Sequence, residues 1–257
     1  MSTQLDFTVE AQVGYISFYE ENEKHPCTLD HRTLDELNRI IDLIKERQSE
    51  IRAVVVQSRS PKYFVVGANI KALQELSPLN MDEWVKKGHL IFNRFQQLPM
   101  PVIAKIRGYA LGGGLELGLS CDFIVAAATA HFGQPEASLG VIPGWGGSYR
   151  LTARIGAARS KEMFFTGKII TADRAFELGL VNQVVPLEEL DQTLGAILDA
   201  IKKNDATAIM YTKQIINNHA ERGMEENRIE EATASVVCLY SPGTRQRLDD
   251  FFNSRKK

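Results

Sequence analysis

The first residues of the chain alternate between apolar and polar positions in two short runs. Phe7 and Val9 hold apolar positions of the first run, and Val13 and Tyr15 hold those of the second. Because successive side chains of a strand point to opposite faces of a sheet, a period of two is typical of a half-buried strand. Two such runs in direct succession predict a β-hairpin over residues 5–18.

A helical spacing of apolar residues replaces this alternation after the hairpin. Thr33 and Glu36 have the spacing of a capping box, which predicts that a helix begins there and continues to about Arg47. A continuous apolar run at 53–57 then predicts a buried strand. Strand, helix and strand in this order favour a right-handed crossover between parallel strands. The apolar positions of the helix share one face: Leu34, Leu37, Ile41 and Ile44.

Strands and helices continue to alternate up to about residue 155, which predicts an α/β core. Two further buried strands are expected at 101–107 and 122–128, on either side of a glycine-rich helix start. The pattern then becomes helical, with apolar stripes at 187–201 and 224–240. Because these stripes offer more apolar surface than one small core needs, we expect the C-terminal helices to pack on the core or on a neighbouring subunit.

The composition is that of an ordinary globular protein with little net charge. Of the 257 residues, 44% are hydrophobic and 24% are charged, and the formal net charge is −2. No whole-molecule field therefore attracts nucleic acid or an anionic membrane, and no apolar run reaches the ~20 residues that span a bilayer. The three cysteines are far apart, and neither they nor the five histidines form a metal-binding motif. We expect a metal-free cytoplasmic protein, since the N-terminus lacks the features of a secretory signal or a transit peptide.

Three consecutive glycines lead from a loop into a predicted helix in the segment Gly112-Gly113-Gly114-Leu115-Glu116. Glycines let a backbone approach a ligand closely, and the free N–H groups of a helix start favour developing negative charge, so this segment could hold an oxyanion. A tight turn with close helix packing also explains the glycines, and a surface cap in the first turn explains the glutamate. The spacing does not fit a dinucleotide fingerprint, and no phosphate-binding loop occurs.

A second glutamate, Glu136, lies in the segment HFGQPEASLGVIPGWGG. The segment is rich in glycine, proline and small residues, as a loop is, but it is too apolar for an ordinary surface connection. Glu136 is therefore either a solvated loop residue or a carboxylate held beside a site. Trp145, near the end of the segment, is either a core residue or the wall of a pocket.

Four segments together resemble the enoyl-CoA hydratase/isomerase (crotonase) family, in order and at the family's spacing: GYALGGGLEL, CDFIVAA, FGQPEASLGVIPGWGGSYRL and TADRAFELGLVNQVV. The similarity covers nearly the whole chain. It implies an α/β fold in which strand-strand-helix units form a spiral, followed by a helical C-terminal region. The expected division is a core with the CoA site at 1–195 and a helical oligomerisation region at 196–257. The resemblance also implies a homotrimer or a dimer of trimers.

The resemblance assigns both glutamates and the glycine cluster to one site. The family's catalytic glutamates fall on Glu116 and Glu136, and its two oxyanion N–H groups fall on Ala68 and Gly113. The expected substrate is an acyl-CoA thioester, with no separate cofactor, no metal, and neither nucleic acid nor a membrane as partner. The residues expected to contact the substrate or its CoA portion are Lys24, Pro26, Val66, Ala68, Asn69, Ile70, Lys71, Gly112, Gly113 and Trp145.

Two carboxylates beside a polarised thioester suit the reversible addition of water to a 2-enoyl-CoA, since one can deprotonate the water while the other supplies a proton to C2. We expect Glu116 to act on the water and Glu136 on C2. The alternatives are Δ3,Δ2-enoyl-CoA isomerisation, which needs one carboxylate, and a non-catalytic member that binds RNA or a protein. The chain departs from the family at Asn69, where aspartate is usual, but asparagine can also cap the following helix.

Overall fold

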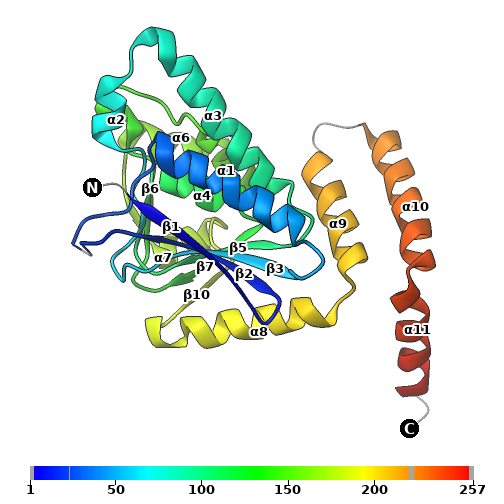
Figure 1. The fold of residues 1–257 in the computed structure, drawn as a ribbon. Coiled ribbons are helices and arrows are strands. Elements are labelled where there is room, and N and C mark those ends of the chain that lie inside the picture. Colours follow the sequence, from blue (N-terminus) through cyan, green and yellow to red (C-terminus); the bar gives the residue numbers. More distant parts are fainter. Residues whose placement is uncertain (1–2, 23, 220–222, 255–257) are drawn as a thin grey trace.

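The computed structural model describes residues 3–22, 24–219 and 223–254, and the chain begins with the predicted hairpin (Figure 1). Strands β1 (Gln4–Glu10) and β2 (Val13–Tyr19) run antiparallel. Ala11 and Gln12 form the turn and have positive φ angles of 46° and 67°, as a tight two-residue hairpin requires. The prediction of a hairpin over 5–18 is therefore confirmed.

Helix α1 (His31–Glu46) follows, but it starts differently from the prediction. Asp30 is the N-cap: its carboxylate accepts a hydrogen bond from the Thr33 N–H at 2.8 Å, and Thr33 Oγ1 accepts one from the Asp30 N–H at 2.7 Å. The predicted capping box of Thr33 with Glu36 is wrong, because the aspartate three residues earlier provides the stronger cap. The predicted apolar face is confirmed, since all four of its residues are buried: Leu34, Leu37, Ile41 and Ile44.

The larger sheet has six strands in the order β1-β2-β3-β5-β7-β10. Strands β3 (Ala53–Ser58), β5 (Val102–Ile106), β7 (Phe123–Ala127) and β10 (Gln183–Val185) are all parallel to β2. The first three of these lie where the apolar runs predicted buried strands. Parallel neighbours need a crossover connection, and α1 supplies the one between β2 and β3.

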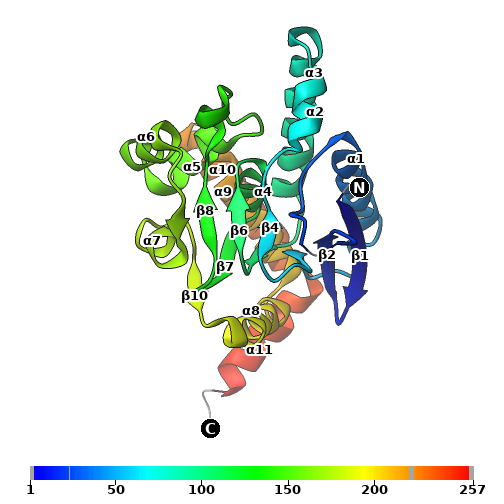
Figure 2. The same cartoon turned by 90° about the vertical axis from the view of Figure 1, so that its left-hand side faces the viewer.

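A second, smaller sheet has the order β4-β6-β8-β9, and Figure 2 shows β4, β6 and β8 side by side. Its strands are β4 (Tyr63–Val65), β6 (Tyr109–Leu111), β8 (His131–Gly133) and β9 (Ile170–Thr171). Along the chain, β3, β5 and β7 of the larger sheet each lead into a strand of the smaller sheet and then into a helix. This repeated unit confirms the expected spiral. The helices that follow these strands are α2 (Ile70–Glu75), α3 (Pro78–Gln96), α4 (Gly113–Ser120) and α5 (Gly147–Ile155).

Both faces of the larger sheet are buried. Val54 and Val56 of β3 belong to the core that includes the apolar face of α1, whereas Val55 packs with helix α8 (Leu190–Lys203) on the other side. Figure 1 shows α1 and α8 on opposite faces of the sheet. The stripe at 187–201 therefore packs on the core, which is one of the two places expected for it. Its buried members are Leu190, Leu194 and Leu198.

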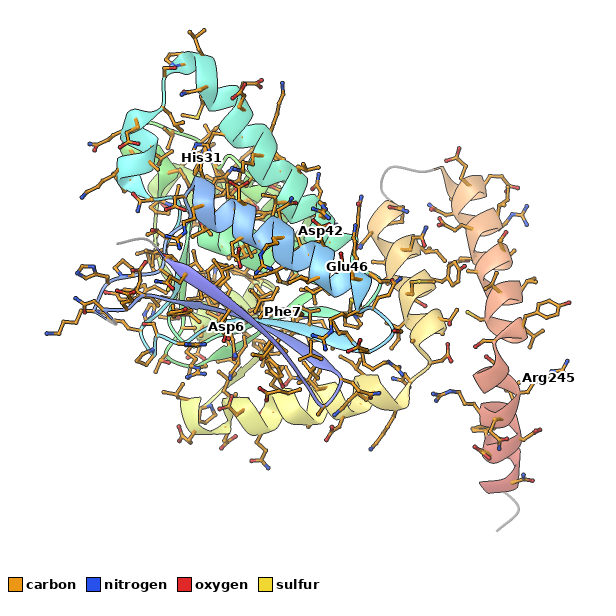
Figure 3. All side chains as sticks on the ribbon, in the orientation of Figure 1. Asp6, Phe7, His31, Asp42, Glu46 and Arg245 are labelled. Atoms are coloured by element: carbon orange, nitrogen blue, oxygen red, sulfur yellow. The ribbon has the colours of Figure 1, made fainter. Side chains whose placement is uncertain are left out.

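The last two helices stand apart from the two sheets (Figure 1). Helix α10 (Met224–Tyr240) coincides with the predicted stripe at 224–240, and most of its side chains are exposed. Figure 3 shows side chains of α10 and α11 (Pro242–Ser254) projecting into open space, with Arg245 pointing away from the core. The expected division after residue 195 falls inside α8, and a separate role for 196–257 stays a prediction.

The other helices pack around the spiral or follow it. Within the described ranges, no helix is long and apolar enough to cross a membrane. The bounds of these helices are α6 (Ala157–Thr166), α7 (Ala172–Glu177), α9 (Ala206–Asn218) and, as 3₁₀ helices, η1 (Glu136–Leu139) and η2 (Leu187–Glu189).

Candidate active site

Three loops that carry predicted site residues leave the smaller sheet from the same edge. Ala68 follows β4, Gly113 follows β6, and Glu136 follows β8. These three strands are parallel neighbours (Figure 2). Because the carboxyl ends of parallel strands meet at one edge of a sheet, the topology brings together residues that lie far apart in the sequence.

The backbone N–H groups of Ala68 and Gly113 lie close together at this edge. A β-carbon at Gly113 would lie 3.6 Å from the amide nitrogen of Ala68. Gly113 is the first residue of α4, so its N–H is one of those that a helix leaves without an internal partner. Among the residues that the structure describes, neither N–H donates to a protein acceptor. The pair is therefore available to a carbonyl oxygen that gains negative charge.

Glu116 lies in the first turn of α4 and is almost completely buried, with 2% of its surface exposed. Its Oε1 accepts hydrogen bonds from the N–H groups of Trp145 and Gly147, each at 2.7 Å. Burial raises the pKa of Glu116, whereas these two N–H groups and the charge of Arg150 oppose the rise. The interpretation of Glu116 as a surface cap is therefore wrong. Both N–H groups bind Oε1, and the described protein offers Oε2 no hydrogen bond.

Glu136 begins the 3₁₀ helix η1, and its side chain packs against the glycine cluster. A β-carbon at Gly112 would lie 3.1 Å from Glu136 Oε1, and Gly112 has a φ of +51°. Any other residue at position 112 would therefore crowd the carboxylate and strain the backbone. Burial, followed by the charge of Glu116, raises the pKa of Glu136 to about 7. This is not the environment of a solvated loop residue.

The raised pKa predicts that Glu136→Gln affects stability in a pH-dependent way. In the unfolded chain the glutamate has its ordinary pKa of about 4.3, so the folded protein binds this proton more tightly. Ionisation of Glu136 therefore destabilises the fold progressively as the pH rises from about 4.3 to about 7, and the full loss persists above that.

Urea unfolding of the variant and the native chain at several pH values tests this. Between pH 4 and pH 8, the difference in free energy of unfolding should grow by on the order of 2 kcal/mol in favour of the variant. Glu116 is present in both proteins, so the part of its titration that does not depend on the charge of Glu136 cancels. A difference that stays constant with pH, or that favours the variant more at pH 4, would contradict the prediction.

Gln134 is a site residue that the sequence analysis did not identify. Its side chain is fully buried, and its amide nitrogen donates to both oxygens of Glu136, at 2.6 Å to Oε1 and 3.0 Å to Oε2, in the amide orientation that its partners require. These bonds hold the carboxyl group of Glu136 in one orientation. No local pattern marks this pair, because Pro135 between the two residues is not extended, with a ψ of 9°, and Glu136 begins a 3₁₀ helix.

The two glutamates line one small cavity, with a volume of about 110 Å³. Helix α3 contributes an apolar wall made of Met81, Trp84 and Val85. No local pattern in the sequence marks this wall, because a helical apolar stripe does not reveal which of its residues line a cavity. Six of the predicted substrate-contacting residues line the cavity: Val66, Ala68, Ile70, Gly112, Gly113 and Trp145.

The other four predicted contact residues lie outside this cavity. Lys24 and Lys71 are exposed, and Pro26 is partly buried. Asn69 is the N-cap of α2, and its Oδ1 accepts a hydrogen bond from the Lys71 N–H at 3.0 Å, which confirms the expected cap. The segment after Pro26 pairs with the loop after β4 through backbone hydrogen bonds, so it borders the site. Contact of these four residues with CoA stays a prediction.

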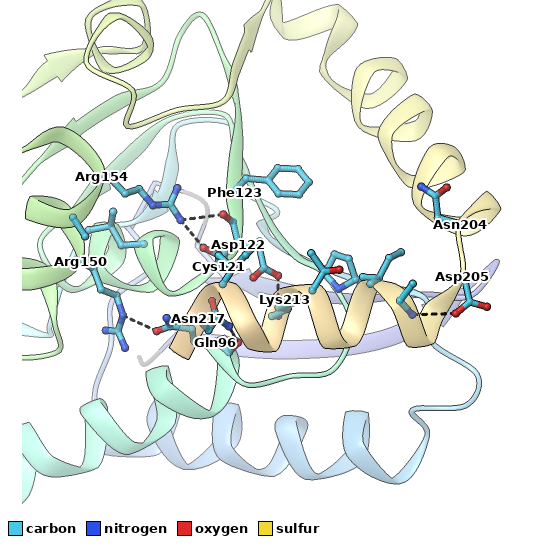
Figure 4. A pocket seen from close by; sticks show the side chains of 17 residues that line it. Gln96, Cys121, Asp122, Phe123, Arg150, Arg154, Asn204, Asp205, Lys213 and Asn217 are labelled. Carbon is cyan, nitrogen blue, oxygen red and sulfur yellow. Dashed lines mark hydrogen bonds and ion pairs between the residues drawn. The ribbon is translucent and has the colours of Figure 1, made fainter. Parts of the chain in front are cut away.

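A larger cavity, of about 750 Å³, lies between α9 and the core (Figure 4). Neither glutamate lines it. Charged side chains that line it are already paired: Lys213 Nζ lies 2.8 Å from Asp122 Oδ2, and Arg154 donates to the carbonyl of Cys121 at 2.6 Å. The smaller cavity is therefore the candidate active site. In the described part of the chain, no three His, Cys, Asp or Glu side chains are grouped so that they could hold a metal ion.

Both the sequence and the fold match known proteins. A model of the family described as Enoyl-CoA hydratase/isomerase matches residues 8–255. The chain is 36% identical over 228 residues to a short-chain-enoyl-CoA hydratase of Clostridium acetobutylicum, which covers 89% of this chain and 87% of that protein. It is 33% identical over 238 residues to a crotonyl-CoA hydratase of Syntrophomonas wolfei, which covers 93% and 91%. The crystal structure of an enoyl-CoA hydratase from Bacillus anthracis has a TM-score of 0.91 and 32% identity, and the match covers 99% of this chain and 97% of that chain.

Proposed function

The chain belongs to the enoyl-CoA hydratase/isomerase family, and from this membership we propose that it is an enoyl-CoA hydratase. Such a lyase adds water reversibly across the 2,3-double bond of an enoyl-CoA, and the reverse reaction dehydrates a 3-hydroxyacyl-CoA. The observation that carries the proposal is the pair of glutamates, Glu116 and Glu136, at one small and largely apolar cavity. Similarity to proteins named short-chain-enoyl-CoA hydratase and crotonyl-CoA hydratase supports the same reaction. The substrate itself brings CoA, so we propose no separate cofactor.

In this proposal the N–H groups of Ala68 and Gly113 hold the thioester oxygen. They draw electron density from the conjugated double bond, which makes C3 electrophilic, and they stabilise the enolate that forms when C3 is attacked. Gly113 is the first residue of α4, so the positive end of the helix dipole acts in the same direction.

The two glutamates then divide the proton transfers. Two N–H groups fix Glu116 through Oε1, so Oε2 is free to take a proton from water as its oxygen bonds to C3. The electrons of the double bond move to C2 and the thioester oxygen. A pKa of about 7 suits Glu136 to donate a proton to C2, and Gln134 holds its carboxyl group in place. The proton taken by Glu116 must return to Glu136 before the next turnover.

The test is loss of the enoyl-thioester absorbance over a panel of 2-enoyl-CoA substrates. We expect hydration to proceed and to survive treatment with EDTA, since the proposed chemistry needs no metal. Failure to hydrate any member, combined with conversion of 3-enoyl-CoA into 2-enoyl-CoA, would identify an isomerase instead. Failure of both reactions, with retention of RNA on a filter, would favour the non-catalytic binding member.

We further propose that the protein is a cytoplasmic homotrimer or dimer of trimers. Helix α10 exposes apolar side chains that one subunit leaves uncovered, and burying them against another copy would be favourable. Light scattering in dilute neutral buffer is expected to report a trimer or a hexamer. A monomeric mass with full activity would exclude this assembly. The exposed apolar residues of α10 include Ile229, Val236, Leu239 and Tyr240.

A further inference from the structure

We propose that two indole rings, those of Trp145 and Trp84, close the acyl cavity and restrict the substrate to short enoyl groups of about four carbons. This inference rests on the proposed function, because it concerns the acyl group of the same site. In this proposal Trp145 sets the chain-length selectivity. Gly88 leaves the room that the Trp145 ring occupies, because it has no β-carbon.

Trp145 is fixed by its neighbours rather than free to swing aside. Its ring centroid lies 5.0 Å from that of Trp84 and 5.6 Å from that of Phe92, and its Nε1 donates to the Trp84 carbonyl at 3.3 Å. The indole also lies directly on Gly88 of α3, where a β-carbon would be only 2.1 Å from the ring. With 2% of its surface exposed, the ring is part of the packed core.

The same residue borders the reacting groups. The Trp145 N–H binds Glu116, and a β-carbon at Gly113 would lie 2.7 Å from the Trp145 ring. The ring therefore lies against Gly113, whose N–H would help to hold the thioester oxygen. Trp145 is therefore both a buried core residue and part of the cavity lining, so it fits both interpretations offered for it.

The volume of the cavity sets the length limit. An apolar cavity of roughly 150 Å³ holds one benzene molecule, whereas this one measures about 110 Å³. The thioester carbon, C2 and C3 must occupy the part beside the glutamates, so little room remains beyond C4. The open side of the cavity has to admit the CoA portion, which directs the acyl tail toward the closed indole wall. Exposed apolar residues mark the open side: Ile70, Leu139 and Ile142.

The first test compares kcat/KM for 2-enoyl-CoA substrates of four, six, eight and ten carbons. We expect the value for eight carbons to lie at least about 10-fold below that for four, since a rigid pocket discriminates by roughly 10–200-fold per misfitting methylene. Trp145→Leu should raise the ratio of eight-carbon to four-carbon kcat/KM by about 10-fold or more. Met81→Ala enlarges the same cavity, and Met81 is partly exposed. If Trp145→Leu does not fold, the same rise in the ratio is expected in Met81→Ala. Leu90→Ala, an exposed position on α3 outside the cavity, is the matched control and should not change the ratio.

A second test does not depend on turnover. The chain contains only two tryptophans, Trp84 and Trp145, and both line this cavity, so intrinsic fluorescence reports on it directly. Butyryl-CoA should change the emission at concentrations where octanoyl-CoA and free CoA do not. The proposal is overturned if butyryl-CoA and free CoA change the emission equally. It is also overturned if kcat/KM is equal for four and eight carbons, or if the ratio is unchanged in both Trp145→Leu and Met81→Ala. Selective binding of butyryl-CoA without hydration of any enoyl-CoA would instead reject the proposed function and leave the length limit standing.

Discussion

Replacing Glu116 or Glu136 with glutamine is expected to lower the kcat of hydration by roughly 10²–10⁴-fold, the usual contribution of general acid–base catalysis. Glutamine keeps the shape of each side chain. At position 116 its amide oxygen can still accept from the N–H groups of Trp145 and Gly147, but it cannot take a proton from water. At position 136 it remains neutral and cannot supply a proton to C2. Steady-state rates with a four-carbon 2-enoyl-CoA measure both effects.

Glu177→Gln is the matched control, since Glu177 is an exposed partner of Arg174 on α7 and should leave kcat unchanged. The two active-site variants should also differ from each other. Isomerisation of a 3-enoyl-CoA moves a proton within the substrate and needs one carboxylate, so it should survive better in Glu116→Gln than in Glu136→Gln. Hydration that persists in a folded Glu116→Gln while isomerisation disappears would reject the two-carboxylate proposal, because Glu116 would then serve the isomerisation and not the hydration.

Gly114→Ala should destabilise the protein by about 3 kcal/mol or more, at the upper end of what overpacking costs. A β-carbon at position 114 would lie 1.8 Å from the carbonyl oxygen of Val65. Val65 belongs to β4, which is paired with β6, so neither the strand nor α4 can move away without breaking sheet hydrogen bonds. The free energy of unfolding from urea titration measures the loss.

Gly195→Ala provides the comparison, because Gly195 lies inside α8 and a β-carbon there would meet nothing within 4 Å. Alanine has the higher helix propensity, so this variant should be more stable than the native protein by roughly 0.5–1 kcal/mol. Similar effects of the two substitutions would show that the close approach of α4 to β4 does not matter to stability.

Periodicity predicted the fold well where one face of an element is buried and the other is not. The hairpin, α1 and the three central strands all have this property or are buried throughout, so the sequence carries their pattern directly. The start of α1 was wrong because Asp30 and Thr33 both have capping side chains, and only the backbone geometry selects between them. The sequence left open whether the core or another subunit covers the 187–201 stripe, because periodicity identifies an apolar face but not the surface that covers it.

The candidate site was predictable only in part. Family resemblance located Glu116, Glu136, Ala68 and Gly113, and the topology places them at one edge of the smaller sheet. Gln134 was missed because a buried glutamine among small residues resembles ordinary loop sequence until its partner is known. Met81 and Trp84 were missed for a different reason: their contact with the site depends on how α3 crosses the glycine cluster, which no local pattern specifies.

The polar groups of the site lie just beyond the ends of short strands and in the first turn of α4, whereas part of the cavity wall comes from α3, a connection between two turns of the spiral. Insertions or deletions in such connections alter the chain length between site residues without displacing the strand ends, because each end is fixed by its neighbours in the sheet. Descendants of this chain could therefore exchange or reshape the α2–α3 segment and accept different acyl groups while keeping the same proton transfers. Reaction type and substrate range are thus inherited through different parts of the sequence.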